Sequence, residues 1–465
     1  MRAVNLKSNW AILLALTIGA QLPIGKAHAL PVFARQTGQE CIACHISFPE
    51  LTPYGRYFKL TGYTIGQRQW VPLAMMAQEG ITSISNNNST DNTGAPNGSV
   101  INRDNNPLFA GYSIFLAGKA TDFLGAFIQY TYNNVSNAQS PAAQLKGATA
   151  TDNTDIRAVY KYYEPSELEL NYIFGFTLNN NPTVQDVWNS TPAFGFPFTT
   201  SPVAPTPGAA TLIDGGLAQQ VAGYGVYAYL KKTLYVEFSL YQTADGMLSW
   251  MRHGQDPSSE ARLQGVNPYY RVALTHDWGP HSAMIGAYGI NARVYADNNN
   301  PSAGTNRFVD NAFDAQYQYI TNPHVVTSQF TFIYETQHQD ANFASGAASN
   351  PTDVLKTWKA KLTYYYQRKY GATFQYFDTA GTIDPLLYPP GSDPSFSSSI
   401  NGFLNGSPNS RGQIYELDFV PIQNLRLMLQ YTAYNKFNGG SNNYDGFGRN
   451  ASFNNTMFLN IWFAY

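Results

Sequence analysis

From about residue 70 onward, the chain consists of runs of about 10 to 15 residues in which apolar or aromatic side chains alternate with polar ones. Leu425, Leu427 and Leu429, for example, alternate with Arg426 and Gln430. A period of two is that of a β-strand whose two faces meet different surroundings. We place sixteen such strands at residues 70–84, 108–120, 122–134, 153–163, 167–177, 219–231, 233–243, 267–278, 280–296, 306–320, 323–338, 354–368, 370–380, 410–420, 423–436 and 455–465.

The connections between these strands alternate between short and long. Thr121 and Lys232 are one-residue links, whereas 85–107 and 178–218 are long and polar. A soluble sandwich has no reason to keep every second connection short, but an outer-membrane barrel has short periplasmic turns and longer extracellular loops. We therefore predict an all-β fold, with a 16-stranded outer-membrane β-barrel over residues 70–465.

A barrel of sixteen strands leaves a lumen wide enough for an aqueous channel unless something fills it. Residues 30–69 precede the first predicted strand. Because that strand begins at the end with short turns, we expect this segment to enter from the periplasm and to plug the pore.

Composition and charge exclude other classes of protein. Charged residues make up only 12% of the chain and aromatic residues 15%. After the first 30 residues, however, no apolar run approaches the roughly 18 residues that a spanning helix needs, which excludes a helical membrane protein. The net charge is −2 and the Lys and Arg residues are dispersed, which argues against a nucleic-acid-binding protein.

The first 29 residues have the three parts of a secretory signal peptide. Arg2 and Lys7 precede an apolar stretch at 10–20, and the small-residue site Ala27-His28-Ala29 follows it. We expect residues 1–29 to be removed on export, which leads the protein through the periplasm to the outer membrane.

The chain has only two cysteines, Cys41 and Cys44, and His45 follows at once. This is the C-x-x-C-H pattern of c-type haem attachment. Two thiols on one short turn can form thioethers to a haem, and the adjacent imidazole can then be an axial iron ligand. A local disulfide and a thioredoxin-like redox pair are alternatives, but the second expects alternating strands and helices, which do not follow. We predict one covalent haem c, in a small N-terminal haem domain at 30–69.

Aromatic and basic residues follow the motif. Phe48 and Phe58 are expected to pack against the porphyrin. A guanidinium suits a carboxylate, so Arg56 is a candidate contact of a haem propionate, with Arg35 and Lys59 as further candidates. For each of the three, an ordinary solvated cation is an equal alternative.

The sixth ligand of the haem iron is open in the sequence. The nearest thioethers are those of Met75 and Met76, about 30 residues beyond His45 in the first predicted strand, where a Met can also simply pack. An open or water-ligated site and a distant His are the alternatives.

This combination resembles the fused outer-membrane monohaem cytochrome c-porins of iron-oxidising bacteria. The resemblance is specific over about residues 33–80 and only architectural across the barrel; the stretches that carry it are Phe33-Ala-Arg-Gln-Thr-Gly38, Cys41-Ile-Ala-Cys44-His45 and Phe48-Pro-Glu-Leu-Thr-Pro-Tyr-Gly-Arg56. It implies that Cys41, Cys44 and His45 bind the haem. It further implies an iron oxidase, an Fe(II):cytochrome c oxidoreductase, that takes electrons from extracellular Fe(II) and passes them to a periplasmic carrier such as a soluble c-type cytochrome.

Two other functions fit the same sequence features. One is a diffusion porin or transporter whose haem is structural or sensory, and the other is electron export to an extracellular acceptor. Carboxylates such as Asp91, Asp104, Asp152 and Asp155, placed in loops, could hold Fe(II) briefly as hard oxygen ligands, although polar loops always contain Asp. The scattered histidines lack metal-ligand spacing and are interpreted as wall or loop residues.

Overall fold

The structure is a computed structural model. It describes residues 31–86, 105–134, 148–164, 169–182, 184, 186–188, 190, 199–253, 260–390 and 402–465. The predicted signal peptide at 1–29 lies outside the described residues, and so do Asp91 and Asp104. Within the described ranges, no helix is long and apolar enough to cross a membrane.

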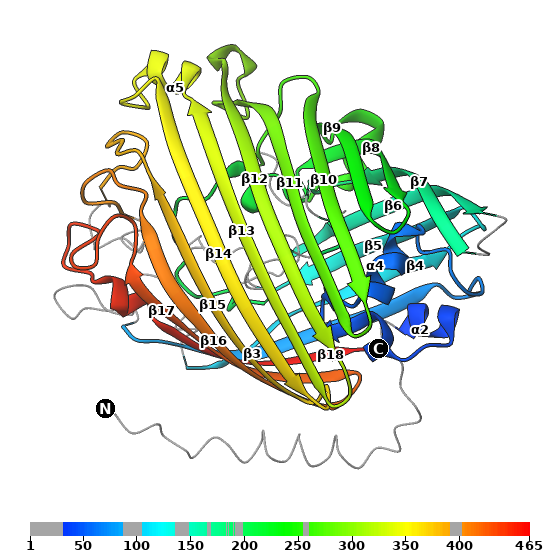
Figure 1. The fold of residues 1–465 in the computed structure, drawn as a ribbon. Coiled ribbons are helices and arrows are strands. Elements are labelled where there is room, and N and C mark those ends of the chain that lie inside the picture. Colours follow the sequence, from blue (N-terminus) through cyan, green and yellow to red (C-terminus); the bar gives the residue numbers. More distant parts are fainter. Residues whose placement is uncertain are drawn as a thin grey trace.

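Sixteen antiparallel strands form one closed barrel (Figure 1). Each strand pairs with its neighbours in sequence, and β18 closes the barrel on β3, with Thr456 opposite Ile84 and Ala464 opposite Met76. The number of strands and their order confirm the prediction. The strands are β3 (Leu73–Ile84), β4 (Pro107–Lys119), β5 (Leu124–Asn133), β6 (Ala148–Glu164), β7 (Glu169–Asn179), β8 (Val221–Leu230), β9 (Leu234–Thr243), β10 (Asn267–Trp278), β11 (His281–Tyr295), β12 (Thr305–Ile320), β13 (His324–His338), β14 (Thr352–Tyr366), β15 (Tyr370–Gly381), β16 (Ser410–Ile422), β17 (Leu425–Lys436) and β18 (Thr456–Ala464).

The alternation in the sequence becomes the two faces of the wall. In β10, Tyr269 and Arg271 point into the barrel and are fully buried, whereas Val272 and Leu274 point outward and are 45% and 48% exposed. An outer face of apolar side chains is stable against lipid and not against water, and a closed barrel leaves no unpaired strand edge in the bilayer. The chain is therefore an outer-membrane barrel.

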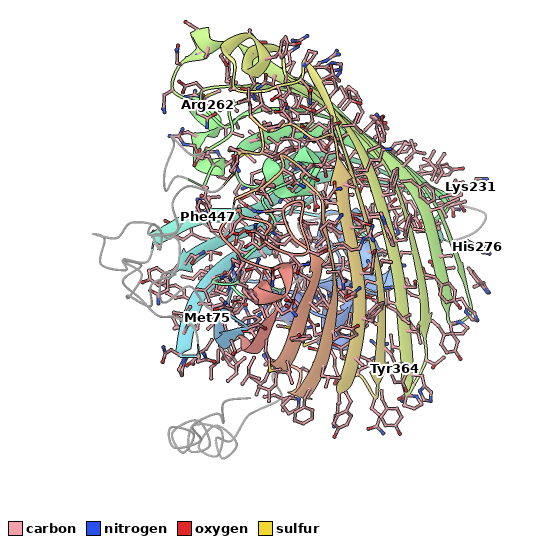
Figure 2. All side chains as sticks on the ribbon, turned by 90° about the vertical axis from the view of Figure 1, so that its left-hand side faces the viewer. Met75, Lys231, Arg262, His276, Tyr364 and Phe447 are labelled. Carbon is pink, nitrogen blue, oxygen red and sulfur yellow. The ribbon has the colours of Figure 1, made fainter. Side chains whose placement is uncertain are left out.

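Tight turns occupy one end of the barrel and longer connections the other. Residues 231–233 link β8 to β9, and residues 367–369 link β14 to β15. The first two residues of each link have positive φ, as both central residues of a type I′ turn do. Outward aromatic side chains such as Tyr364 lie near this end (Figure 2). We call it the tight-turn end, and the topology of outer-membrane barrels places it in the periplasm.

The N-terminal segment folds against the inner wall near the tight-turn end (Figure 1). Helix α4 begins where the Thr52 hydroxyl accepts a hydrogen bond from Gly55 N, with Pro53 at its first position. The elements of the segment are α2 (Pro31–Thr37), α3 (Cys41–Cys44), β1 (His45–Ser47), β2 (Glu50–Leu51) and α4 (Pro53–Leu60).

The long connection between β7 and β8 also enters the lumen. The carbonyl oxygen of Trp188 accepts hydrogen bonds from the β12 and β13 wall, that of Thr199 accepts one from β17, and Asp214 forms an ion pair with β14. The described part of this connection therefore crosses from one side of the barrel to the other. The remaining short elements are η2 (Leu212–Gly216), η3 (Gly246–Met251), η4 (Pro301–Ala303), α5 (Asp340–Ser345) and η6 (Ala451–Asn454).

Candidate cofactor site

The C-x-x-C-H motif forms a single helical turn, α3, followed by an extended residue. Thr52 holds this turn: its backbone N donates to the Cys44 carbonyl oxygen over 2.9 Å, and its hydroxyl donates to the carbonyl oxygen of Ala43 over 2.5 Å. Gly55 packs so closely that a Cβ atom there would collide with the Cys44 carbonyl oxygen. Helix α4 is thus the support on which the motif is built.

Cys41 and Cys44 form no disulfide with each other. Cys41 is buried and Cys44 half-buried. Burial raises the pKa of the Cys44 thiol to about 11, which keeps it protonated at neutral pH.

The motif lines a cavity of about 620 Å³, which falls within the range of roughly 300–1,000 Å³ typical of cofactor and ligand sites. The segment and the barrel wall both contribute to it. The rings of His45 and Phe48 lie 5.0 Å apart, and Phe48 lies 6.0 Å from the Trp462 ring of β18. Further aromatic walls come from Phe33, Phe58, Phe115 and Phe127.

The His45 side chain fits the role of a metal ligand. Its Nδ1 atom is buried and has no hydrogen-bond partner among the described residues. Burial lowers the pKa of His45 to about 4, so the imidazole is neutral, and the neutral form is the one that ligates a metal. An imidazole nitrogen without a hydrogen-bond partner, two thiols outside any disulfide and an aromatic cavity together suit a covalently attached haem. No group of three or more His, Cys, Asp and Glu among the described residues could hold a bare metal ion.

The two candidate thioethers lie on opposite faces of β3. Met76 lines the cavity and packs beside Phe115, whereas Met75 points outward and is 46% exposed. Of the pair, only Met76 is placed where it could approach a group in the cavity. Its role as the sixth ligand stays a prediction.

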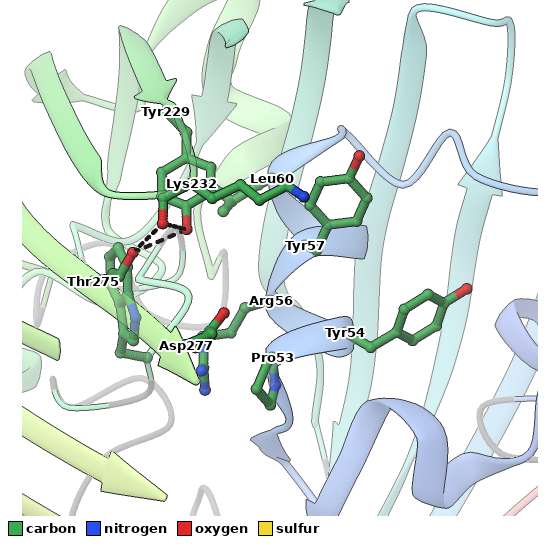
Figure 3. Close-up of a pocket in the computed structure, with 10 residues that line it drawn as sticks. Pro53, Tyr54, Arg56, Tyr57, Leu60, Tyr229, Lys232, Thr275 and Asp277 are labelled. Carbon is green, nitrogen blue, oxygen red and sulfur yellow. Dashed lines mark hydrogen bonds between the residues drawn. The ribbon is translucent and has the colours of Figure 1, made fainter. Parts of the chain in front are cut away.

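The Arg56 side chain is held by the barrel wall. Its guanidinium donates to Gln318 over 2.6 Å, to Gln316 over 3.0 Å and to Ser282 over 2.6 Å, all on the barrel wall. It lines a second cavity of about 370 Å³, between α4 and the ends of β8 to β10 (Figure 3), rather than the cavity of the motif. A contact between Arg56 and a haem propionate stays a prediction, and the structure offers Lys59 as the better placed cation.

Lys59 lines the motif cavity and is almost fully buried. Its ammonium group donates to the carbonyl oxygens of Val184 and Asp186, in the connection that crosses the lumen. Burial lowers the pKa of Lys59 to about 8, because a charged amine loses its hydration there. A carboxylate in the cavity would stabilise this charge.

The far end of the cavity is polar, with Gln129, Asn133, Asp152 and Asn153 in its lining. The prediction that Asp152 and Asp155 lie in loops is wrong, because both belong to β6. The strand starts five residues earlier than expected and so includes Asp152, and Asp155 already fell within the strand predicted at 153–163. Asp155 is committed to a buried ion pair with Arg157 at 2.8 Å and accepts a hydrogen bond from Tyr63. Of these two aspartates, only Asp152 lines the cavity, together with Glu40 of the N-terminal segment.

Sequence reasoning missed the barrel residues that complete the site. Phe115, Phe127 and Trp462 were assigned only to strands, although their inward places in the alternation could have identified them as lumen residues. The outward His276 and His281 stack on the Trp278 ring, and His324 stacks on the Tyr364 ring, in agreement with their interpretation as wall residues.

No protein-family model and no curated protein matches the chain. Among solved structures, the chain is similar to OprB of Pseudomonas putida (14% identity, TM-score 0.47, 84% of this chain and 93% of that one). It is also similar to OmpF of Salmonella typhi (10%, 0.46, 84% and 97%) and to the outer membrane channel DcaP of Acinetobacter baumannii (10%, 0.43, 84% and 96%). At these identities and TM-scores, the likeness carries no inference about function.

Proposed function

We propose that this chain holds one covalent c-type haem in its barrel and transfers single electrons across the outer membrane, from extracellular Fe(II) to a periplasmic carrier. One observation carries the proposal: Cys41, Cys44 and His45 line an aromatic cavity enclosed between the N-terminal segment and the barrel wall. A haem bound there would supply a one-electron redox centre, which a wall of Tyr, Asn and aliphatic side chains lacks.

Each residue of the site has a distinct part in this proposal. Cys41 and Cys44 would supply the thiols for two thioether bonds, and the neutral His45 imidazole would supply a nitrogen ligand to the iron. Lys59 would offer a charge to a propionate, and Met76 would offer a thioether on the wall. Phe and Trp side chains of the cavity would surround the haem, and the polarity of these surroundings would tune its redox potential.

The cavity extends along the wall away from the tight-turn end. Its lining on β5 runs from Phe127 to Asn133, about 20 Å of strand at a rise of roughly 3.3 Å per residue. At the polar end, the carboxylate of Asp152 offers hard oxygen ligands of the kind that Fe(II) accepts. A donor arriving from the side of the long loops therefore meets Asp152 before it meets the thiols.

The test is to mix Fe(II) anaerobically with the oxidised, detergent-solubilised protein and to record the absorption spectrum of the protein from milliseconds to minutes. The proposal expects a c-type haem spectrum and reduction by Fe(II). Reduction by dithionite but not by Fe(II) would move the function to electron export or to a channel.

The barrel itself supports a second candidate, a diffusion channel. The inner wall carries polar and charged side chains such as Arg271, Asp314 and Gln329, as the inner walls of porins do, although the β7–β8 connection covers these three. Conductance in planar lipid bilayers separates the two functions. An open channel gives large steady currents, whereas a lumen crossed by the segment and by the β7–β8 connection gives small ones.

A further inference from the structure

The turn of the C-x-x-C-H motif, α3, lies at the rim of the barrel, at the tight-turn end. Gln423, in the turn between β16 and β17, accepts a hydrogen bond from Cys41 N over 3.2 Å. Arg368, in the turn between β14 and β15, donates to the carbonyl oxygen of Ile42 over 2.6 Å and to that of His45 over 3.4 Å. Two periplasmic turns therefore hold the motif directly.

A groove of about 160 Å³ opens between the motif and these two turns. We call it the rim groove; Cys41, Ile42 and Phe48 line one side, and Arg368, Lys369 and Gln423 line the other. Ile42, the residue between the two cysteines, is 38% exposed. The motif thus has one side in the large cavity and the other side at the periplasmic surface.

The charge at the mouth of the rim groove is positive. Arg368 and Lys369 take part in no ion pair among the described residues. Arg426 lies deeper and is paired with Glu416 at 2.6 Å and with Asp418 at 2.7 Å.

Glu40, the residue before Cys41, is exposed, but it lines the large cavity and not the rim groove. The charged residues in the lining of the rim groove are Arg368, Lys369 and Arg426. A protein that docks at the mouth of the rim groove therefore meets a surface with an excess of cations.

We propose that the rim groove is the docking site of a periplasmic electron carrier that presents acidic side chains around its own redox centre. The inference rests on the proposed function and specifies its partner. Opposite charges steer such transient encounters and raise their rate, while leaving them weak enough for turnover. The step is the transfer of one electron: the carrier is reduced and the haem held at Cys41 is oxidised, with no bond formed and no proton moved.

The test uses the full barrel in detergent or nanodiscs and two labelled probes of opposite charge. Plastocyanin, a blue-copper protein with an acidic patch, represents the proposed partner, and a basic cytochrome c of the mitochondrial type is its counterpart. Binding is followed by fluorescence anisotropy at low and at physiological salt, so that it needs no haem. The variants are Lys369→Glu at the groove and, as matched control, Lys231→Glu, an exposed lysine in the β8–β9 turn at the same end.

The proposal expects the acidic probe to bind more tightly than the basic one and to weaken with salt. Lys369→Glu should weaken the binding of the acidic probe about fivefold at low salt, because reversing one exposed charge acts on several carboxylates within a Debye length. Lys231→Glu should leave the affinity for this probe unchanged. Equal binding of both probes, or equal effects of both variants, overturns the docking site.

A rate measurement separates this inference from the proposed function. Electron exchange between the haem protein and each probe is followed in whichever direction the potentials drive it, and the same variants are compared. Loss of binding specificity with intact reduction by Fe(II) refutes the docking site alone. Specific binding without reduction by Fe(II) refutes iron oxidation alone, and a protein that attaches no haem overturns both.

Discussion

A buried ion pair ties the N-terminal segment to the barrel. The Lys361 ammonium of β14 lies 2.9 Å from Glu50 Oε2, and each side chain is 1% exposed. Replacing one partner of such a pair leaves the other charge buried and costs about 3–5 kcal/mol. In Glu50→Gln the amide oxygen still accepts a hydrogen bond from Lys361, so we expect the lower value, about 3 kcal/mol. That corresponds to a population of detached segment about a hundredfold larger.

Native-state proteolysis measures this population, because cleavage follows the fraction of open molecules when opening and closing are fast. Trypsin sites at Arg56 and Lys59 report detachment of the segment. The matched control is Asp214→Asn, which breaks the pair of Lys359 with the β7–β8 connection on the same strand and leaves the segment contacts in place. Adding Lys361→Met to Glu50→Gln should restore much of the protection. If Glu50→Gln is cleaved at the wild-type rate, the pair does not hold the segment.

Three further predictions concern the site itself. Gly55→Ala should destabilise the segment by about 1–3 kcal/mol and lower the yield of covalent haem, measured by absorbance per protein, because a methyl group overpacks the motif turn; a yield equal to wild type would contradict it. Met76→Ala should change the haem spectrum and its potential while the outward Met75→Ala does not, and identical spectra for both variants would remove Met76 as a ligand. Burial lowers the pKa of Lys59 from 10.5 to about 8, so the unfolded state binds this proton more tightly than the folded state does. The protection of the haem-free segment against proteolysis should therefore rise between pH 8 and 10.5. This rise should be missing in Lys59→Gln.

The barrel could be predicted from the sequence because a membrane wall imposes one rule on every strand. Lipid outside and polar side chains inside produce a period of two, and tight turns at one end fix which strands pair. The limits of most other strands differ from the predicted ones by one to three residues, and the largest difference is at the start of β6, which lies five residues before the predicted one. Its first residues, from Ala148 to Asn153, look like a polar loop, yet they pair with β5, with Thr149 opposite Tyr132, because the lumen accepts polar side chains on the inner face.

The site was only half visible in the sequence. The C-x-x-C-H spacing is local, so Cys41, Cys44 and His45 could be recognised without a fold. The contributions of Trp462 and Phe115, and the distinction between Met75 and Met76, depend on which face of a closed barrel each residue takes. The engagement of Arg56 by wall glutamines depends on how deeply α4 enters the lumen, which no pattern in the segment encodes.

The central claim is that Cys41 and Cys44 carry a haem, and the mass of the intact protein tests it most directly. The protein is produced with a c-type haem maturation system, denatured, and compared with the Cys41→Ser/Cys44→Ser double variant. The account predicts that the wild-type chain carries the added mass of one haem, that the haem stays with the peptide containing both cysteines after digestion, and that the double variant has neither. A wild-type chain with the mass of the polypeptide alone, under conditions in which a known c-type cytochrome is matured, would contradict it.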